Sequence, residues 1–487
     1  MFRVVALLLL GQVAEQPLSP ADAVAQAHAD LAKLAPEIRP SVRYLSMYQI
    51  PSTERIKVRQ VLNGHVNGLS REPDLTPVTI VQGSQAALVR VVLRDYSWEA
   101  KTWEKLLDPY FSATVETTYE DPWRGGVWSE DDKYYAPNTF TVRRTIKTQA
   151  LAPWLTETPE AQRKLADVVQ WTQSKMPVVR ADWFLNMTGA AADRSPNYYD
   201  FIGVKNEKDF QLLAGVDVSL SEARKSVHRE AVAVSGVALK SRAIIRLGAI
   251  DAGYYKTLDF KTNVDAKNPL RVLGKEIEGS FDATEQIAAL PNGMLAYFLG
   301  NNKGEAQAAA PDFIATDATS LSNDRRVHAN VSCIRCHTNG GLQDVDGWVK
   351  NLLTAPLDLK SPDYEKAREL RREYARDLEA KIKQDRALYD AAVKQATGMD
   401  SKAYSAAYSS LWESYENATV DLGRAAADLG TTPDKLKAAI SAQVKANYGN
   451  TVLPVLLLEN PRLNRIPVRV WEEMYAETQL LMKGYGQ

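Results

Sequence analysis

The chain is 487 residues long, of which 45% are hydrophobic and 24% are charged. At roughly 100–200 residues per domain, this length predicts two or three domains. The 59 basic and 60 acidic side chains nearly cancel, which argues against a nucleic-acid or anionic-membrane partner recruited by bulk charge. Two cysteines exclude a disulfide-rich scaffold, so the positions of those two residues become informative.

The first fourteen residues have the pattern of an export signal. Arg3 gives a positive charge, Val4 to Leu10 form an unbroken apolar run, and Ala14 is the first choice for the cleavage site. We therefore expect a signal peptide over 1–14 and an exported, periplasmic or otherwise extracytoplasmic protein. A buried N-terminal strand or helix is the alternative. No other stretch approaches the roughly 18 apolar residues that span a bilayer, so no transmembrane segment is expected after cleavage.

Residues 15–350 carry both helix and strand patterns. A short amphipathic helix is expected within 15–40, starting near Ser19-Pro20. Residues 78–93 read as a hairpin whose second arm is rich in β-branched residues. Further strands are predicted at 139–146, 243–247, 253–260 and, after the turn Pro291-Asn292-Gly293, at 294–299.

After about residue 358 the pattern becomes helical. Ser361-Pro362-Asp363 starts a helix that Gly398 ends, a second helix covers 404–415, and a third begins near Thr432-Pro433. The charged face of the first helix is interpreted as solvated, and the tyrosine stripe of the second as core.

The boundary between these two regions is expected near 346–358. The predicted fold class is α+β, with a mixed strand and helix N-terminal and central region over 15–350 followed by a mostly α-helical C-terminal region over 351–487.

Both cysteines fall in one five-residue motif, Cys333-Ile334-Arg335-Cys336-His337. This spacing is typical of a c-type haem attachment site. Two cysteines three residues apart lie on one face of a helical turn, so both sulfurs can reach the vinyl groups on one edge of a porphyrin. The following histidine then projects toward the iron as the proximal ligand. The sequence therefore predicts one covalent haem c.

Three other interpretations of the motif stay open. A redox-active Cys-x-x-Cys pair suits an oxidising compartment, although that motif usually opens a helix early in a βαβ unit. A zinc site would use His328, Cys333 and Cys336, but it lacks a clear fourth ligand. The third is a plain structural disulfide.

The motif resembles that of the c-type cytochromes. More loosely, the stretch from Leu290-Pro291-Asn292-Gly293 through Ala296-Tyr297-Phe298-Leu299 to the motif resembles a group of large exported proteins. In that group a single haem motif lies late in a long chain, after a β-rich region. In a small class I cytochrome the motif lies near the start of a short chain, so the resemblance does not carry that small helical fold over.

The sixth iron position would decide what such a haem does. Met399, in a loop after the long predicted helix, is the first distal candidate, Met294 after the tight turn is the second, and an open site is the third. The candidate basic partners for the haem propionates are Arg325, Arg326 and Arg335.

The expected function is electron transfer by an exported mono-haem c-type cytochrome. Its partner would be a redox protein or a small electron donor or acceptor. The alternative is a haem enzyme of peroxidase or oxidoreductase type with an open distal iron site, and a third is a sensor or structural haem protein. No Gly-rich phosphate loop, His-Glu-x-x-His or Gly-x-Ser-x-Gly motif is present.

Overall fold

The structure is a computed structural model. It has an N-terminal and central region of mixed strands and helices, followed by a mostly helical C-terminal region. It describes residues 20–107, 112–121, 127–129, 134–136, 138–147, 158–190, 198–224, 226–232, 242–248, 253–260, 281–312, 314–316, 325–338, 340–345, 359–360, 364–365, 368, 378–445 and 452–482. The predicted signal peptide over 1–14 and the boundary near 346–358 lie outside these residues. The described part is α+β as predicted, with sheets in the N-terminal and central region and helices toward the C-terminus.

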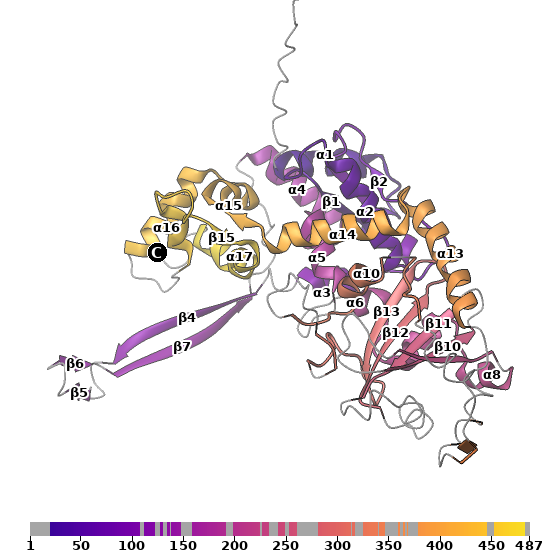
Figure 1. Ribbon diagram of the computed structural model, residues 1–487. Coiled ribbons are helices and arrows are strands. Elements are labelled where there is room, and N and C mark those ends of the chain that lie inside the picture. The colour runs from indigo at the N-terminus through magenta and orange to yellow at the C-terminus, as the bar shows by residue number, and fades with distance from the viewer. Residues whose placement is uncertain are drawn as a thin grey trace, which may run out of the picture.

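Four strands form a small mixed sheet near the N-terminus (Figure 1). In the order β2-β3-β1-β8, they are β2 (Thr79–Ile80), β3 (Leu88–Val92), β1 (Val42–Ser46) and β8 (Val178–Arg180). The antiparallel pair β2 and β3 confirms the hairpin predicted over 78–93. The parallel pairing of β1 with β8 joins segments far apart in the chain, so no local sequence pattern predicted it.

Helices cover both faces of this sheet because its strands alternate their buried side chains between two cores. On one side Tyr44 and Val178 pack with α1 (Pro20–Lys33), the helix predicted within 15–40, and with α4 (Pro159–Thr172). On the other side Leu45 packs into the main core. The helices that contribute there are α2 (Arg55–Gly68), α3 (Ala100–Leu107) and α5 (Ala181–Gly189), with short 3-10 turns η1 (Arg39–Ser41) and η2 (Leu93–Tyr96) between elements.

Five antiparallel strands form the central sheet, in which each strand pairs with its neighbour in the chain. They are β9 (His228–Val232), β10 (Arg242–Gly248), β11 (Gly253–Leu258), β12 (Ala283–Ala289) and β13 (Leu295–Asn301). The patterns at 243–247, 253–260 and 294–299 are thereby confirmed as strands, whereas β9 and β12 were not predicted.

One face of the central sheet is closed by short helices. They are α6 (Tyr198–Ile202), α7 (Glu207–Leu213) and α8 (Val218–Ala223). Phe210 of α7 stacks on Phe298 of β13 with ring centroids 5.4 Å apart, and it also contacts Tyr254 of β11. The opposite face of the same sheet is the one that meets the cysteine motif.

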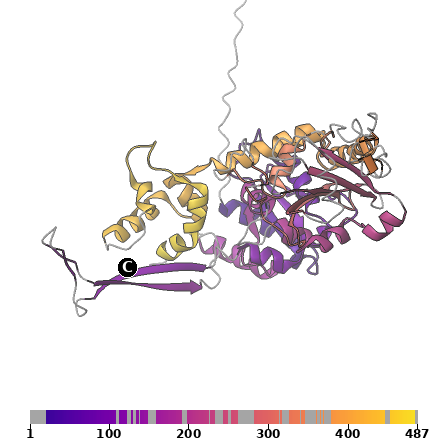
Figure 2. The same ribbon diagram turned by 60° about the horizontal axis from the view of Figure 1, so that its bottom comes forward.

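A long two-stranded hairpin projects from the body beside the C-terminal helices (Figures 1 and 2). Its arms are β4 (Ser112–Asp121) and β7 (Asn138–Lys147), which contain the strand predicted at 139–146, and a second pair, β5 (Val127–Ser129) with β6 (Tyr134–Ala136), lies at its tip.

Two long helices cross the molecule after the motif. α13 (Leu378–Thr397) contacts β9, β11 and α2, and α14 (Ser401–Glu416) contacts α2, α5 and the motif helix. Gly398 separates them with a positive φ of 78°, as its predicted role as a helix end requires. The start of the helix predicted at 361–397 lies outside the described residues, and the helix predicted at 404–415 is confirmed within α14.

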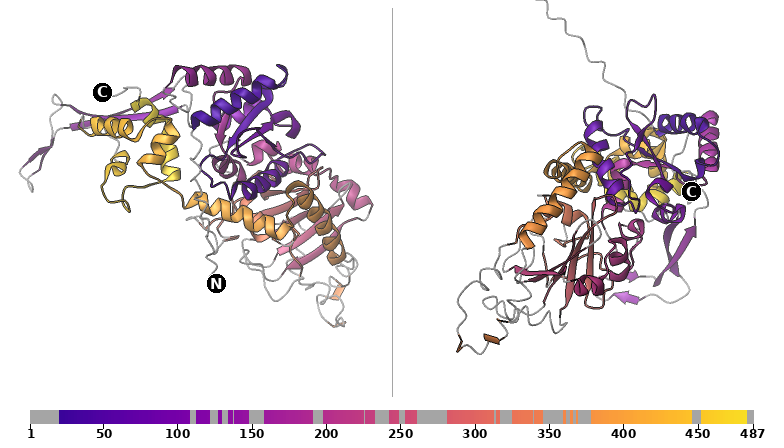
Figure 3. Two further views of the ribbon diagram at one scale, coloured as in Figure 1. Left: turned by 90° about the horizontal axis from the view of Figure 1, so that it is seen from above. Right: turned by 90° about the vertical axis from the view of Figure 1, so that its right-hand side faces the viewer.

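The last region is a group of helices to which α14 leads from the main body (Figure 3). It contains α15 (Leu422–Leu429), α16 (Pro433–Lys445), η4 (Leu453–Leu457) and α17 (Val468–Met482), with a short pair β14 (Thr419–Val420) and β15 (Ile466–Pro467). α16 confirms the helix predicted to begin near Thr432-Pro433. Among the helices in the described ranges, none combines the length and apolar character needed to cross a membrane.

Candidate functional site

The predicted haem motif lies on a short helix, α10 (Val331–Cys336). The amide of His337 donates to the carbonyl of Cys333 at 2.8 Å, and the chain then leaves the helix, with φ −93° and ψ 54° at His337. Cys333, Cys336 and His337 therefore follow one another at i, i+3 and i+4 along a single turn. This is the arrangement that the sequence motif predicts.

Packing fixes this helix and leaves the motif side chains only partly exposed. Val331, Ser332 and Ile334 are buried, whereas the cysteines and His337 are only half-buried. The hydroxyl of Ser405 on α14 donates to the carbonyl of Ile334 at 2.6 Å. The side-chain amide of Asn330, just before the helix, donates to the carbonyl of Gly189 at 2.8 Å. Two distant segments therefore hold α10 in place.

The two thiols are free, and their surroundings favour the protonated form. No disulfide joins Cys333 to Cys336. Burial raises the pKa of both thiols, and the nearby Arg335 only partly opposes this at Cys336. An activated redox dithiol requires a lowered thiol pKa, so neither the disulfide nor the dithiol-catalyst interpretation matches this geometry. In the described part of the chain no three His, Cys, Asp or Glu side chains are grouped to hold a metal, and the zinc set with His328 is not assembled.

The face of the central sheet on which α13 packs lies beside the motif. The ring of Tyr297 on β13 is 6.4 Å from the ring of His337, centroid to centroid. Tyr297 pairs with Ile287, so the alternation of side chains along β12 puts Glu285 on the same face. Through the same alternation, the pairs Tyr255–Ile287 and Arg246–Tyr255 bring Arg242 of β10 to this face.

A buried arginine organises the carboxylates on this face. Nε of Arg242 lies 2.9 Å from Oδ1 of Asp259, and its Nη1 donates to Oε2 of Glu285 at 2.7 Å. Burial, the largest single influence, favours the neutral form of Glu285, but the attraction of Arg242 and its hydrogen bond together outweigh burial and hold the pKa of Glu285 below its usual value. Burial raises the pKa of Asp259 to about 7, despite Arg242. Glu285 is therefore the ionised member of the pair.

Several buried polar atoms around the motif have no hydrogen-bond partner among the described residues. They are Nη2 of Arg242, Oε1 of Glu285, Oη of Tyr297, Nδ1 of His337 and Nη2 of Arg386. Arg386 comes from α13, and its Nε donates to the carbonyl of Leu342 at 2.9 Å in the loop after the motif. An unpaired buried polar atom costs about 1–3 kcal/mol, so a concentration of them marks a place where another polar group or water would find partners.

The imidazole of His337 is neutral in this environment. Burial lowers its pKa to about 4, Glu285 acts in the opposite direction, and Arg242 and Arg386 lower it further. Neutral imidazole is the form that ligates a metal. Two free thiols, a neutral imidazole and unpaired cationic donors for carboxylates together form a donor set that fits a covalent haem. The predicted propionate partner Arg335 lies beside Cys336.

Both predicted distal methionines lie in turns that touch the loop after His337. The side chain of Leu295, which follows Met294, packs so closely on Gly341 that any side chain at position 341 would collide with it. Ser401, two residues after Met399, accepts a hydrogen bond from the amide of Gly340 at 3.0 Å. Met294 is buried and lines a cavity of about 10 Å³ with Ile334. Met399 is partly buried against the main core.

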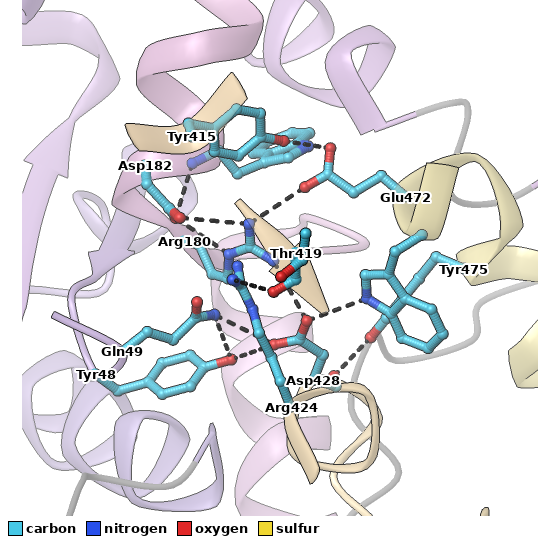
Figure 4. Close-up of polar contacts among 12 residues, drawn as sticks. Tyr48, Gln49, Arg180, Asp182, Tyr415, Thr419, Arg424, Asp428, Glu472 and Tyr475 are labelled. Carbon is cyan, nitrogen blue, oxygen red and sulfur yellow. Dashed lines mark hydrogen bonds and ion pairs between the residues drawn. The ribbon is translucent and has the colours of Figure 1, made fainter. Parts of the chain in front are cut away.

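A second polar cluster, far from the motif in the chain, surrounds Arg180 at the end of β8 (Figure 4). Its guanidinium nitrogens lie 3.1 Å from Asp182, 3.4 Å from Asp428 of α15 and 3.3 Å from Glu472 of α17. Tyr48 donates to Asp428 at 2.7 Å. The cluster therefore ties the N-terminal sheet to the C-terminal helices.

A cavity of about 40 Å³ lies within this second cluster. Its walls include Arg180, Asp428 and Glu472 together with aromatic side chains such as Trp471. Burial raises the pKa of Glu472 to about 7, against the attraction of Arg180. Nothing in the sequence had singled out these residues, because they converge from four separate segments.

The motif side chains were predicted from sequence, but the residues that surround them were not. Glu285, Arg242, Tyr297 and Arg386 were missed, although a charged residue inside an apolar strand, as in Arg242-Ala243-Ile244-Ile245, is a usable signal. No protein-family model matches the chain, and no curated protein or solved structure matches it significantly. The chemistry of the site is therefore argued from its own residues.

Proposed function

We propose that this chain is an exported mono-haem c-type cytochrome that transfers electrons through covalently bound haem. The observation that carries the proposal is the presence of Cys333, Cys336 and His337 on one turn of α10 with both thiols free. In this proposal the two sulfurs form thioether bonds to haem, and His337 is the proximal iron ligand. Haem would supply one-electron chemistry by cycling between ferric and ferrous iron.

The protein's own residues would bind and orient this group. The hydrogen bonds from Ser405 and Asn330 hold α10 rigidly, so the thiols and the imidazole keep their relative positions. The sheet face that carries Tyr297 and Ile287 would lie against one side of the group. Arg242 and Arg386 have unpaired nitrogens suited to carboxylates, so they join Arg335 as proposed propionate partners.

Met399 remains the first proposed distal ligand and Met294 the second, because both turns reach the loop that follows His337. The apolar run near Arg3 supports export, and the outer location suits covalent haem attachment. A redox protein or a small electron donor or acceptor is the proposed partner.

The experiment is expression of the full chain together with the c-type haem maturation machinery. The wild-type protein should keep its haem on a denaturing gel and show a sharp low-spin spectrum when reduced. Cys336→Ser should leave at most one thioether link, and His337→Ala should abolish normal iron ligation. His328→Ala is the matched control, because His328 lies close in the chain and has no role in the proposed ligation, so its spectrum should be that of the wild type.

Two outcomes would change the proposal. A high-spin spectrum that shifts on addition of carbon monoxide or cyanide would replace simple electron transfer by the haem enzyme with an open iron site. A chain that takes up no covalent haem would end the haem proposal altogether.

A further inference from the structure

Glu285 and His337 each keep one buried polar atom without a hydrogen-bond partner in the described part of the chain. The atoms are Oε1 of Glu285 and Nδ1 of His337. Because the Glu285 carboxyl group is ionised, its oxygen acts as an acceptor and not as a donor. Nδ1 of His337 donates a hydrogen bond when the neutral ring carries its proton there. The two atoms are therefore complementary in chemistry.

The strand register brings Glu285 close to the tyrosine ring that lies against His337. Glu285 lies on the same face of the central sheet as Ile287, the strand partner of Tyr297. The ring of Tyr297 is 6.4 Å from the His337 ring. Glu285 is thus a diagonal neighbour of the residue that contacts His337, a separation of roughly 7–8 Å between backbones that long side chains bridge.

Arg242 holds the Glu285 carboxylate by its other oxygen. Nη1 of Arg242 donates to Oε2 at 2.7 Å, while Nε of the same arginine is bound to Asp259 at 2.9 Å. The side chain of Glu285 is therefore fixed at one oxygen and unsatisfied at the other. Such a carboxylate is an oriented acceptor for a neighbouring donor.

We infer that Glu285 is a positioning residue for His337: its Oε1 accepts the hydrogen bond from Nδ1 of the imidazole when His337 serves as the iron ligand. The inference rests on the proposed function, because it assumes that role for His337. A ligating histidine almost always donates its second ring N–H to a carboxylate, a backbone carbonyl or water, and this contact fixes the ring and its tautomer. With the proton at Nδ1, Nε2 is left for the metal.

An anionic carboxylate as the hydrogen-bond partner of His337 affects the reduction potential of the protein. An anionic acceptor increases the electron density on the imidazole, which stabilises ferric iron relative to ferrous iron. Glu285 would therefore lower the reduction potential of the protein compared with a neutral hydrogen-bond partner. A role confined to sheet stability would leave the potential unchanged.

The test is a redox titration of the haem-loaded full chain with Glu285→Gln. This substitution keeps the shape of the side chain and removes its charge. At a fixed solution potential we expect the ferrous-to-ferric ratio to rise about tenfold, which is about 59 mV for a one-electron couple. Glu207→Gln is the matched control, because Glu207 is also paired with a cation, Lys256 at 2.6 Å, but contacts the opposite face of the same sheet. Its potential should equal that of the wild type.

A second variant covers the chance that loss of the charge beside Arg242 prevents folding. Glu285→Asp keeps the charge but withdraws the carboxylate by one methylene, so the potential should again rise, by a smaller amount. A wild-type potential in both haem-loaded Glu285 variants overturns the inference and leaves the proposed function intact. A changed reduction potential in Tyr297→Phe, with wild-type potentials in both Glu285 variants, also overturns the inference. It would identify the Tyr297 hydroxyl as the hydrogen-bond partner of His337. A wild-type chain without covalent haem overturns both proposals.

Discussion

Two buried arginines organise carboxylates in this molecule, and they differ in how completely their surroundings are paired. Arg180 meets three carboxylates, and Asp428 also accepts hydrogen bonds from Tyr48 and Trp471. In the part of the chain that the structure describes, none of these six residues has a buried polar atom left unpaired. Around Arg242, by contrast, one nitrogen of the arginine and one oxygen of Glu285 lack partners.

The difference distinguishes a structural cluster from a candidate binding site. A polar network whose members are all satisfied stabilises the packing of the segments that contribute to it. A network with several unsatisfied buried atoms is stable only because something else compensates, and a bound group is the simplest compensation. The Arg180 cluster therefore joins regions of the fold, whereas the Arg242 cluster beside His337 is where we expect a ligand.

The largest effect is expected when the complete cluster is broken. Arg180→Gln removes the cation that faces Asp182, Asp428 and Glu472, and leaves three buried carboxylates without it. Loss of one partner from a buried ion pair costs about 3–5 kcal/mol. Urea unfolding followed by circular dichroism should show a decrease of that size in the free energy of unfolding.

The control for this substitution is Lys164→Gln, which removes an ion pair at the protein surface. Lys164 forms an i,i+4 pair with the largely exposed Glu160 on α4, so its loss should change stability by at most about 0.5 kcal/mol. If Arg180→Gln were as mild as this control, the Arg180 cluster would not be the structural junction described above.

A pH-dependent effect of intermediate size is expected at Glu472. Burial is the main cause that raises its pKa to about 7, compared with about 4.3 in an unfolded chain. Between these values the folded protein holds a proton that the unfolded chain has lost, so this group makes stability fall as the pH rises through that window. By pH 8 the loss should be on the order of 3 kcal/mol.

Glu472→Gln tests this directly, because glutamine does not ionise. The variant should be more stable than the wild type at pH 8 and should lose that advantage at pH 5, as measured by urea unfolding at the two pH values. Glu473→Gln, at the neighbouring exposed position of α17, should follow the wild type. Equal slopes for the wild type and Glu472→Gln would contradict the raised pKa of Glu472.

The elements that sequence predicted are those with a local signal. The hairpin of β2 and β3 has β-branched alternation around a turn, and α16 has a proline at its start. β12 was missed because Glu285 and Gln286 interrupt its apolar pattern. The parallel pair of β1 and β8 depends on contacts between segments more than a hundred residues apart, which no local window contains.

The same division applies to the candidate site. Cys333, Cys336 and His337 are adjacent in the chain, so their spacing alone was enough to predict the motif. Glu285, Arg242 and Arg386 reach it from β12, β10 and α13. The register of β10 and β12 in the sheet, together with the packing of α13 on that sheet, brings them together.

The smallest effects on stability are expected when a single tyrosine hydroxyl is removed from each cluster. Tyr48→Phe removes a hydroxyl that donates to Asp428 at 2.7 Å, and should cost about 1.5–3 kcal/mol because the acceptor is charged. Tyr297→Phe removes a buried hydroxyl that has no partner in the described part of the chain, so without haem it should change stability by no more than about 0.5 kcal/mol or even increase it. Both tyrosines are buried and keep the same aromatic ring after substitution, so the two differences can be compared directly by urea unfolding of the haem-free chain. Equal costs for the two substitutions would mean that the Tyr297 hydroxyl is paired after all, and the contrast between the closed and the open cluster would be lost.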